Sequence, residues 1–413
     1  LTYTEVGARN MRKRLSSLIG QQAYDIKIST YHGFGSDLIR QHREYFIDLN
    51  DDKPLDSMGQ IKILKEIYEL VPTSNPLWRE EVYLKSVKDF IGEAKKALLK
   101  PKDIRHIART NLEFLEHASQ LSMQIAPFKR MSKEQVPEFH NLLSGLAKIK
   151  TPSVILGNIY SLKDLMIFDL NSALEEFSLI NKTTPLTKFK DKWLTKNDDN
   201  LLVLKGLVEN NKLIGAADIY EQYEKTLKGK GYYDYDDMIN RAIAALENYP
   251  NFKLDIQEKY QYLMLDEFQD TNRSQLKLVE LLTDNPANNG QPNVLAVGDD
   301  DQAIFSFQGA ELGNMIEFTR LYDQVKLINL EENYRSHEDI LTTAYNVADT
   351  IEERLSDKLN LPKKKLKASN KNIKDSEIER RQFLSDARQF EWVAEKIDSL
   401  INEKGIPASE IAV

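Results

Sequence analysis

The segment Tyr260–Asp270, YQYLMLDEFQD, constrains the fold of this chain more than any other part of it. Tyr262–Leu265 is a continuous apolar run of strand length, as in a parallel strand that is buried on both faces. Two adjacent acids, Asp266 and Glu267, follow at its carboxyl end, where open α/β sheets place their ligands. An aspartate there can hold Mg²⁺, and a glutamate can orient or deprotonate a water that attacks a phosphate. The plain alternative is a surface turn whose acids are solvated.

Length and composition narrow the class of protein. The 413 residues are enough for two or three domains, and 41% hydrophobic with 29% charged residues is typical of a soluble globular protein. No apolar run reaches the roughly 18 residues that span a bilayer, and no secretory leader is visible. The absence of cysteine excludes disulfides and thiolate chemistry and favours the cytoplasm. The net charge of −8 argues against an all-over nucleic-acid surface, although a local basic groove is compatible with it.

Strands alternate with helices near both ends of the chain, which predicts an α/β fold with a parallel sheet. Residues 36–228 instead suggest helix after helix, interrupted by proline and asparagine-rich breaks, without strand alternation. A gap of about 190 residues is too long for a loop, so we expect an all-helical domain inserted into the sheet domain. The strands that we expect are Ile26–Thr30, Tyr262–Leu265, Asn293–Val297, 325–330 and Ile378–Leu384.

Three loops at the carboxyl ends of strands carry the candidate chemistry. Besides the acid pair, Gly298–Gln302 follows one buried strand and Asn333–Ser336 follows another. Such loops together are how a nucleotide triphosphatase assembles its site. Gln302 can hydrogen-bond a γ-phosphate, and a guanidinium such as that of Arg335 suits the charge that develops on a transferring phosphoryl group. The ring of Tyr334 offers a flat face on which a base can stack.

Together these residues resemble the superfamily 1 DNA helicases of the UvrD/Rep/PcrA type. LDEFQDTN at 265–272 resembles the family's Walker B motif. Five further segments resemble motif III, motif IV, motif Ia, motif Ib and a short DFDDL-like motif, and they are VGDDDQAIFSFQGA at 297–310, LEENYRS at 330–336, LTYTEVGARNMRKRL at 1–15, STYHGF at 29–34 and YDYDDM at 233–238. The motifs occur in the family's order, and the helical block lies where the family has an insertion.

The resemblance implies a domain plan. Residues 1–35 and 229–322 correspond to a first RecA-like lobe of the P-loop NTPase type. Residues 36–228 correspond to the helical insertion, and 323–413 to the beginning of a second RecA-like lobe. The activity implied is that of an ATP-dependent 3′→5′ helicase or translocase in DNA repair or recombination, with ATP and Mg²⁺ as cofactors. Its implied partners are single-stranded DNA and duplex junctions.

The resemblance also implies a role for individual residues. Asp266 would bind Mg²⁺ and Glu267 would activate the attacking water. Gln302 would sense the γ-phosphate and link it to the DNA site, Arg335 would be an arginine finger, and Tyr334 would stack on adenine. Four residues would line the single-strand track, where stacking suits sequence-independent binding, and they are Tyr3, Thr30, His32 and Phe307.

Each assignment has a plainer alternative. His32 is an ordinary hydrogen-bonded histidine in most contexts, Phe307 fits a hydrophobic core, and Arg335 near a helix start fits a weak surface ion pair. Phe307-Gln308-Gly309-Ala310 stands where many relatives have Trp-Arg-Gly-Ala, and Glu5-Val6 where Asn-Lys is common. Both differences remove a charge or a stacking surface from the expected DNA site.

The largest departure is that Gly-x-x-x-x-Gly-Lys-Ser/Thr does not occur in the sequence, so a phosphate loop is missing. Both ends also have the pattern of interrupted elements, and we therefore expect a fragment that lacks the Walker A motif and the later motifs. Two alternatives stay open. The chain as given is a DNA-binding or interaction module without hydrolysis, or it is the motor part of a helicase fused to a nuclease.

Overall fold

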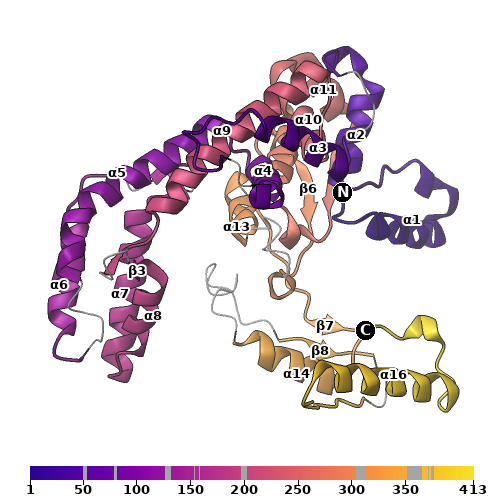
Figure 1. Ribbon diagram of the computed structural model, residues 1–413. Helices are drawn as coiled ribbons and strands as arrows, with labels where there is room; N and C mark the ends of the chain where they lie inside the picture. Colours follow the sequence, from indigo (N-terminus) through magenta and orange to yellow (C-terminus); the bar gives the residue numbers. More distant parts are fainter. Residues whose placement is uncertain are drawn as a thin grey trace. The chain divides into compact units, whose positions relative to one another are not determined.

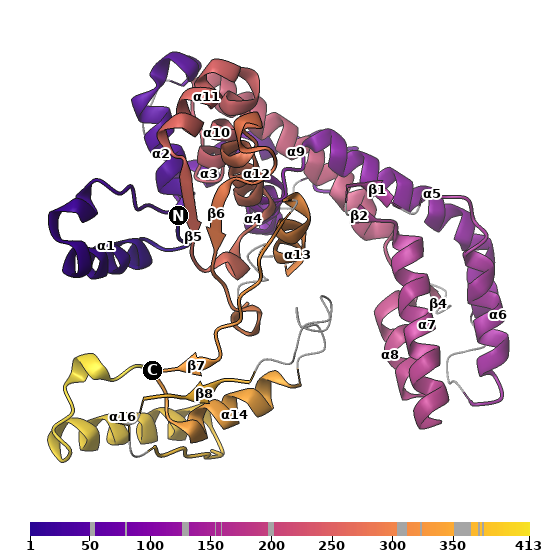
Figure 2. The ribbon, with the colours of Figure 1, turned by 180° about the vertical axis from the view of Figure 1, so that it is seen from behind.

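The computed structural model describes residues 1–49, 54–78, 81–125, 132–152, 154–157, 159–196, 202–303, 312–322, 324–350, 365–370, 372–373 and 376–413. The chain forms two compact units, Leu1–Val325 and Lys326–Val413. Helices make up most of the first unit, the described part of the second unit contains two α-helices, and short strands lie among the helices of both (Figures 1 and 2). No helix among the described residues is both long and apolar enough to cross a membrane.

A parallel strand pair lies in the first unit. β5 (Tyr262–Leu265) pairs with β6 (Asn293–Ala296), so that Tyr262 lies opposite Asn293 and Leu265 opposite Ala296. The expected bounds of β5 are therefore confirmed, and β6 ends one residue earlier than expected. The two strands are visible beside each other in Figure 2.

Backbone hydrogen bonds extend this layer beyond β5. The nitrogen of Leu1 donates to the Met264 carbonyl at 2.5 Å, and the Asp266 amide donates to the Leu1 carbonyl at 2.9 Å. Thr2 in turn forms a parallel bridge with Thr30. That bridge is all that the structure shows of the strand expected at residues 26–30. The RecA-like sheet stays a prediction.

The expectation that β5 is buried on both faces is wrong for the described residues. Leu265 is 1% exposed and Leu263 packs against the core, whereas Tyr262 is 70% and Met264 is 66% exposed. Successive side chains of a strand point to opposite faces, so one face of the sheet is packed and the other is open. The continuous apolar run could not reveal this, because it places apolar side chains on both faces.

Helices α2 (Tyr31–Gln41), α10 (Asp237–Asn248), α11 (Pro250–Lys259), α12 (Arg273–Thr283) and α13 (Leu312–Leu321) surround the packed face. Gly35 allows α2 to lie against the start of α10. A Cβ at this position would lie 2.7 Å from the Met238 carbonyl oxygen, which is closer than van der Waals contact permits. α1 (Glu5–Ile19) begins at the N-cap Thr4, which accepts a hydrogen bond from the Gly7 amide at 2.9 Å.

The middle of the chain forms two further hydrophobic cores. The second core contains side chains of α3 (Ser57–Tyr68), α4 (Leu84–Lys96) and α9 (Leu207–Lys230), together with Ile104 at the start of α5 (Pro101–Ile125). The third core contains the rest of α5 with α6 (Val136–Leu146), α7 (Leu162–Ile180) and α8 (Thr184–Trp193).

The expectation that residues 36–228 are all-helical is wrong, because this block also contains two short antiparallel strand pairs. β1 (Val154–Leu156) and β2 (Ile159–Tyr160) form one antiparallel pair, and β3 (Leu194–Lys196) and β4 (Leu202–Leu204) form another. Strands of two or three residues are too short to show a period of two in the sequence. The expected domain boundaries stay predictions. Residue 36 lies inside α2, and residues 228 and 229 both lie inside α9.

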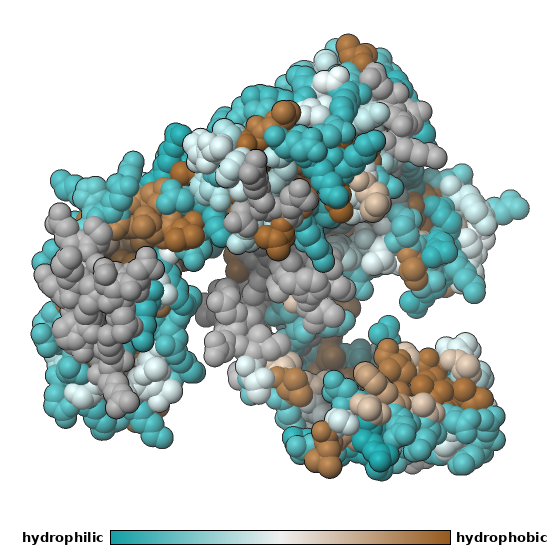
Figure 3. Space-filling model, in the orientation of Figure 1, coloured by the Kyte–Doolittle hydropathy of each residue, from teal (hydrophilic) through white to brown (hydrophobic). Residues whose placement is uncertain are grey.

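The second unit pairs β7 (Glu332–Asn333) in parallel with β8 (Lys367–Ala368), and it contains α14 (Glu338–Ala348) and α16 (Asp386–Asn402). The strands expected at 325–330 and 378–384 are absent from the described residues. Apolar runs suggested both, but Leu327, Ile328 and Leu330 are exposed and pair with no described strand. Figure 3 shows apolar surface on this unit over the region of α16.

Candidate nucleotide and nucleic-acid site

The acid pair sits on a sharp turn at the end of β5. Glu267 has φ +50° and ψ +44°, a left-handed conformation that a non-glycine residue seldom adopts. The turn leads at once into the 3₁₀ helix η5 (Phe268–Asp270), and Phe268 enters the core, where its ring meets Phe318 edge-on at 5.1 Å. Glu267 is exposed, while Asp266 is half-buried. Backbone strain of this kind concentrates at functional sites.

Gln269 connects the acid pair to the loop after β6. Its Nε2 donates to Glu267 Oε2 at 2.8 Å and, more weakly, to Asp270 Oδ2 at 3.3 Å, and its Oε1 accepts from the Asp299 amide at 3.0 Å. The side chain is buried at 2% exposure. Gly298 leaves room for it, because a Cβ there would lie 2.9 Å from Gln269 Oε1. The loops after β5 and β6 thus form one hydrogen-bonded structure.

Gln302 lies at the end of this second loop, in the 3₁₀ helix η7 (Asp300–Gln302). Its Nε2 donates to Asp299 Oδ2 at 2.5 Å, and Asp299 Oδ1 also accepts from the Asp301 amide at 3.2 Å. Gln302 is exposed, so its amide can reach a ligand outside the loop. The structure brings Asp266, Glu267 and Gln302 to the same edge of the β5–β6 pair, and their catalytic roles stay predictions.

The surroundings of Asp266 fit a hard cation. The Tyr31 hydroxyl is buried without a hydrogen-bond partner, and burial together with the negative charge of Asp266 raises the pKa of Tyr31 well above its usual value. Two adjacent carboxylates suit Mg²⁺, which takes one or two protein carboxylates and completes its shell with water and phosphate oxygens. The described residues contain no group of three or more histidine, aspartate or glutamate side chains that could hold a metal ion. A Mg²⁺ ion that is bound partly by water and phosphate oxygens needs only one or two protein carboxylates.

Thr30 serves mainly as a structural element. Its hydroxyl accepts from the Gly33 amide at 3.0 Å as the N-cap of α2, and it donates to Glu5 Oε1 at 2.8 Å. The residue is 4% exposed. Glu5, a residue that differs from the common family pattern, therefore ties the start of α1 to the start of α2. The role of Thr30 in lining a DNA track stays a prediction, and in the structure its hydroxyl joins the starts of α1 and α2.

Tyr3 and His32 line a cavity of about 640 Å³ in the first unit. A third ring, that of Tyr235, stacks on His32 with 4.0 Å between ring centroids and 20° between ring planes. α4 supplies Lys88 and Lys96 to the lining of the cavity. Burial, and to a lesser extent the nearby Lys96, lowers the pKa of His32 to about 4, so the imidazole is neutral at physiological pH. Aromatic rings, lysines and carboxylates thus line one cavity.

A buried ionic cluster lies beneath this cavity and anchors the segment that precedes α10. Lys95 Nζ lies 2.6 Å from Asp234 Oδ2 and 2.8 Å from Asp237 Oδ1, and the Lys95 side chain is 1% exposed. The Tyr223 hydroxyl donates to Asp234 Oδ2 at 3.1 Å. Burial by itself would lower the pKa of Lys95, but the two carboxylates outweigh it and raise the pKa, so the lysine is charged. The DFDDL-like segment is thereby joined to α4 and α9.

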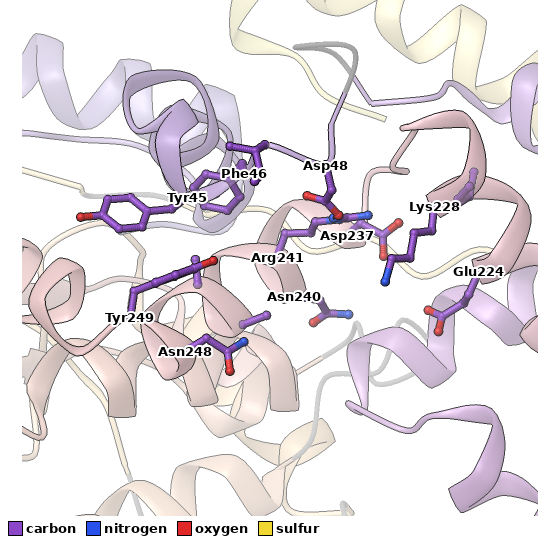
Figure 4. Close-up of a pocket in the computed structure, with 14 residues that line it drawn as sticks. Tyr45, Phe46, Asp48, Glu224, Lys228, Asp237, Asn240, Arg241, Asn248 and Tyr249 are labelled. Carbon is purple, nitrogen blue, oxygen red and sulfur yellow. The ribbon is translucent and has the colours of Figure 1, made fainter.

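A second cavity, of about 580 Å³, is lined by Asp237 and by residues of other segments of the first unit. Figure 4 shows Asp48 beside Arg241, with which it forms an ion pair at 2.5 Å, and Tyr45 near Tyr249 at the other end of the cavity. None of the residues that the sequence predicts for the site lines it. Its mixture of acids, bases and tyrosines specifies no ligand class.

Three predicted site residues are not joined to this site by the structure. Phe307 lies outside the described residues. Tyr334 and Arg335 belong to the second unit, where the Asn333 side chain accepts from the Arg335 amide at 2.9 Å and shapes the turn after β7. Both side chains are exposed, and the Tyr334 hydroxyl donates to Glu332. Their nucleotide contacts stay predictions.

The sequence analysis missed Gln269, Lys95 and Tyr235. Gln269 and Tyr235 lie inside quoted motifs, so position alone could have singled them out. Lys95 carries no local signal, because its partners Asp234 and Asp237 lie about 140 positions away in the chain.

Comparison with known proteins agrees with the family resemblance of the sequence motifs. The sequence model described as "UvrD/REP helicase N-terminal domain" matches residues 1–323. The chain is similar to the ATP-dependent DNA helicase UvrD1 of Mycobacterium tuberculosis, with 31% identity over 214 residues, which is 51% of this chain and 27% of UvrD1. It is 34% identical to DNA helicase II of Rickettsia typhi over 195 residues, which is 47% of this chain and 28% of that protein.

A third relative is the ATP-dependent DNA helicase PcrA of Staphylococcus epidermidis, at 38% identity over 139 residues, which is 34% of this chain and 18% of PcrA. The aligned part of the chain thus spans less than a third of each of these relatives.

Proposed function

Because the chain belongs to the UvrD/REP helicase family, whose sequence model covers residues 1–323, we propose that it is part of an ATP-dependent DNA helicase or translocase of that type. The family resemblance of the motifs is confirmed. The proposal goes further and assigns the chain ATP hydrolysis with Mg²⁺, movement on single-stranded DNA in the 3′→5′ direction, and action at duplex junctions in repair or recombination. Similar proteins bear the names UvrD1, PcrA and DNA helicase II.

The observation that supports this function best is the joined pair of loops after β5 and β6. Glu267 and Asp266 stand at the end of one strand, Gln302 stands beyond the end of its parallel neighbour, and Gln269 bonds both loops. A site for phosphoryl transfer needs a group that positions water and a group that reports the state of the γ-phosphate. The geometry supports Glu267 in the first role and Gln302 in the second.

Asp266, Glu267 and Gln302 each have a separate task in the proposed mechanism. Asp266 would hold Mg²⁺, which would neutralise charge on the phosphates when bound. Glu267 would accept a proton from the attacking water, with its carboxylate oriented by Gln269. Gln302 would transmit the state of the γ-phosphate through Asp299 and Gln269 to the Walker B turn.

Residues 1–35 and 229–322 would form one RecA-like lobe, and residues 323–413 would form the beginning of a second. In this proposal, Arg335 supplies positive charge to the transferring phosphoryl group and Tyr334 stacks on adenine. Closure of the lobes on nucleotide and their reopening after hydrolysis would advance the motor along DNA. Tyr3, Thr30, His32 and Phe307 would line the path of the strand.

The test is ATP hydrolysis by the full-length protein with and without single-stranded DNA, followed by unwinding of duplexes that carry a 3′ or a 5′ tail. The proposal predicts hydrolysis stimulated at least about tenfold by DNA and unwinding from the 3′ tail only. Hydrolysis that is independent of DNA would contradict the motor function, and unwinding from the 5′ tail would contradict the polarity alone.

A further inference from the structure

A carboxylate lies where two helices of the first unit begin. Glu5 is the first residue of α1, and its Oε1 accepts a hydrogen bond from the Thr30 hydroxyl at 2.8 Å. Thr30 is the N-cap of α2, and its hydroxyl also accepts from the Gly33 amide at 3.0 Å. A Cβ on Gly33 would lie 3.6 Å from the same Glu5 oxygen, so the carboxylate lies against the first turn of α2.

Two further contacts hold α1 to the segment that precedes α2. The Thr2 amide donates to the Ser29 carbonyl at 3.1 Å, just before α1 begins. Arg12, further along α1, donates from Nη2 to the Ile28 carbonyl at 3.1 Å. The position of Glu5 between these contacts keeps its carboxylate at the start of α2.

The Thr30 hydroxyl has no hydrogen left for a phosphate. A hydroxyl donates one hydrogen bond, and Thr30 donates it to Glu5. Because the donor is uncharged, this bond leaves the negative charge of Glu5 in place. A DNA phosphate that takes the Thr30 hydrogen must therefore displace the Glu5 carboxylate and lie beside its negative charge.

The charge of Glu5 also acts on the neighbouring cavity. Burial and, after it, the negative charges of Glu5 and Asp236 raise the pKa of the Tyr235 hydroxyl. Tyr235 lines the cavity of about 640 Å³ together with Tyr3 and His32. Two negative charges about 4 Å apart repel each other even in water, and at about 0.1 M salt the repulsion is largely screened only beyond about 10 Å. The Glu5 carboxylate thus opposes phosphate at the start of α2 and around this cavity.

We propose that Glu5 lowers the affinity of the single-strand track for DNA. Its carboxylate competes with the phosphodiester backbone for the Thr30 hydroxyl and repels the phosphates near it. The inference rests on the proposed DNA-binding function and adds to it a residue that acts against binding. The part of the ligand concerned is the backbone and not the bases, so the effect is independent of DNA sequence.

Fold stability and DNA affinity respond in opposite directions to the loss of this charge. A carboxylate near the N-termini of α1 and α2 is favourable, since helices carry a partial positive charge at that end. Removing the charge is therefore expected to lower Tm by a few degrees at most, while DNA affinity rises. A residue with only a structural role would not raise the affinity when it is replaced.

The experiment measures binding of the full-length protein to a fluorescein-labelled oligothymidylate by anisotropy, in the absence of nucleotide. Glu5→Gln keeps an oxygen that can accept from Thr30 but removes the charge, and the Kd is expected to fall about three- to tenfold at about 0.1 M salt. Glu5→Lys reverses the charge and is expected to lower the Kd further.

Salt dependence gives a second readout. Each phosphate of a single strand that the protein neutralises contributes about 0.7 to the slope of log Kd against log salt concentration. With the opposing carboxylate removed in Glu5→Gln, the slope is expected to increase by up to about 0.7. A loss of folded protein alone would leave this slope unchanged.

Asp164→Asn is the matched control. Asp164 is the third residue of α7, and its Oδ2 accepts from the hydroxyl of the N-cap Ser161 at 2.6 Å. The variant removes the same charge from a similar contact, but in a helix of the third hydrophobic core. Its Kd is expected to stay within about twofold of that of the unsubstituted protein, because salt screens a charge far from the track.

The outcomes distinguish the inference from the function on which it rests. If the unsubstituted protein does not bind the oligonucleotide, the DNA-binding function fails and this inference fails with it. If it binds, and Glu5→Gln binds equally well or more weakly, only the inference is wrong. If Glu5→Lys binds no more tightly than Glu5→Gln, the effect is not electrostatic and repulsion is refuted. An equal gain of affinity in Asp164→Asn would assign the effect to net charge and would also refute the inference.

Discussion

Gln269 donates a hydrogen bond from Nε2 to Oε2 of Glu267 at 2.8 Å, across the left-handed turn that ends β5. The same side chain accepts a hydrogen bond from the loop after β6. A surface glutamate is ordinarily free to rotate, and this bond restricts Glu267 to one orientation. Gln269 thus positions Glu267, the general base of the proposed reaction, and is itself hydrogen-bonded to the loop after β6.

Replacing Gln269 should uncouple the two loops. Gln269→Ala removes the bonds to Glu267 and Asp299, so we expect kcat for DNA-stimulated ATP hydrolysis to fall on the order of tenfold or more, as for other groups that orient a reacting side chain. Steady-state kinetics of the full-length protein measure the change.

The matched control for Gln269→Ala is Gln257→Ala. Gln257 is also buried, at 5% exposure, and its Nε2 donates to the Leu281 carbonyl at 2.8 Å in α12, away from the acid pair. Both substitutions leave buried groups unpaired and are expected to lower stability by about 1–3 kcal/mol. An equal fall of kcat in the two variants would mean that Gln269 acts only through stability.

The placement of the acid pair was predictable from the sequence, and the bond that orients it was not. A short apolar run followed by two acids defined β5 to the residue and put Asp266 and Glu267 at its end. One hydrogen-bond partner of Gln269 lies in a loop 30 positions further along the chain. The residues next to Gln269 in the sequence do not predict this partner.

The exposed face of β5 shows another limit of the sequence. Tyr262 and Met264 are apolar, and an apolar side chain is expected to be covered. Whether a face is covered depends on which segments pack against it, and that is a property of the whole fold. The alternation of side chains along a strand assigns each residue to one face of the sheet, but it does not predict whether other segments pack against that face.

Lys95 is predicted to be essential for the stability of the first unit. Lys95→Met would leave Asp234 and Asp237 buried without their cation, and breaking a buried ion pair in this way costs about 3–5 kcal/mol. We expect a fall of several degrees in Tm by calorimetry. The double variant Lys95→Met with Asp234→Asn should recover part of the loss, because one of the unpaired charges is removed.

Lys225→Met is the control for this prediction. Lys225 forms an i,i+4 ion pair with Glu221 at 2.8 Å, but its side chain is 61% exposed. Exposed pairs of this kind contribute about 0.3–0.5 kcal/mol. A loss in Lys95→Met no larger than in Lys225→Met would show that the buried cluster does not stabilise the fold.

Asp236 should make the stability of the first unit depend on pH. Burial, together with the negative charge of Asp234, raises the pKa of Asp236 from 3.8 to about 6. A raised pKa means that the folded state binds the proton more tightly than the unfolded state between about pH 4 and pH 6. The contribution of Asp236 therefore favours folding below about pH 4 and is lost as the pH rises through 6.

Asp236→Asn removes this titration. The variant is expected to gain stability relative to the unsubstituted protein as the pH rises from 4 to 7, by up to about 3 kcal/mol, since one pKa unit corresponds to about 1.4 kcal/mol. Chemical denaturation at a series of pH values measures the difference. A difference that is constant across this range would show that Asp236 has an ordinary pKa.

The most direct test of the proposed motor is Glu267→Gln in the full-length protein, with Glu258→Gln on the exposed surface of α11 as the control. The substitution keeps the size of the side chain and its contact with Gln269 but removes the base. We expect DNA-stimulated ATP hydrolysis to fall at least about a hundredfold, as for the loss of a general base, while ATP binding and Tm stay unchanged. Undiminished hydrolysis in Glu267→Gln would contradict the assignment of Glu267 as the catalytic base.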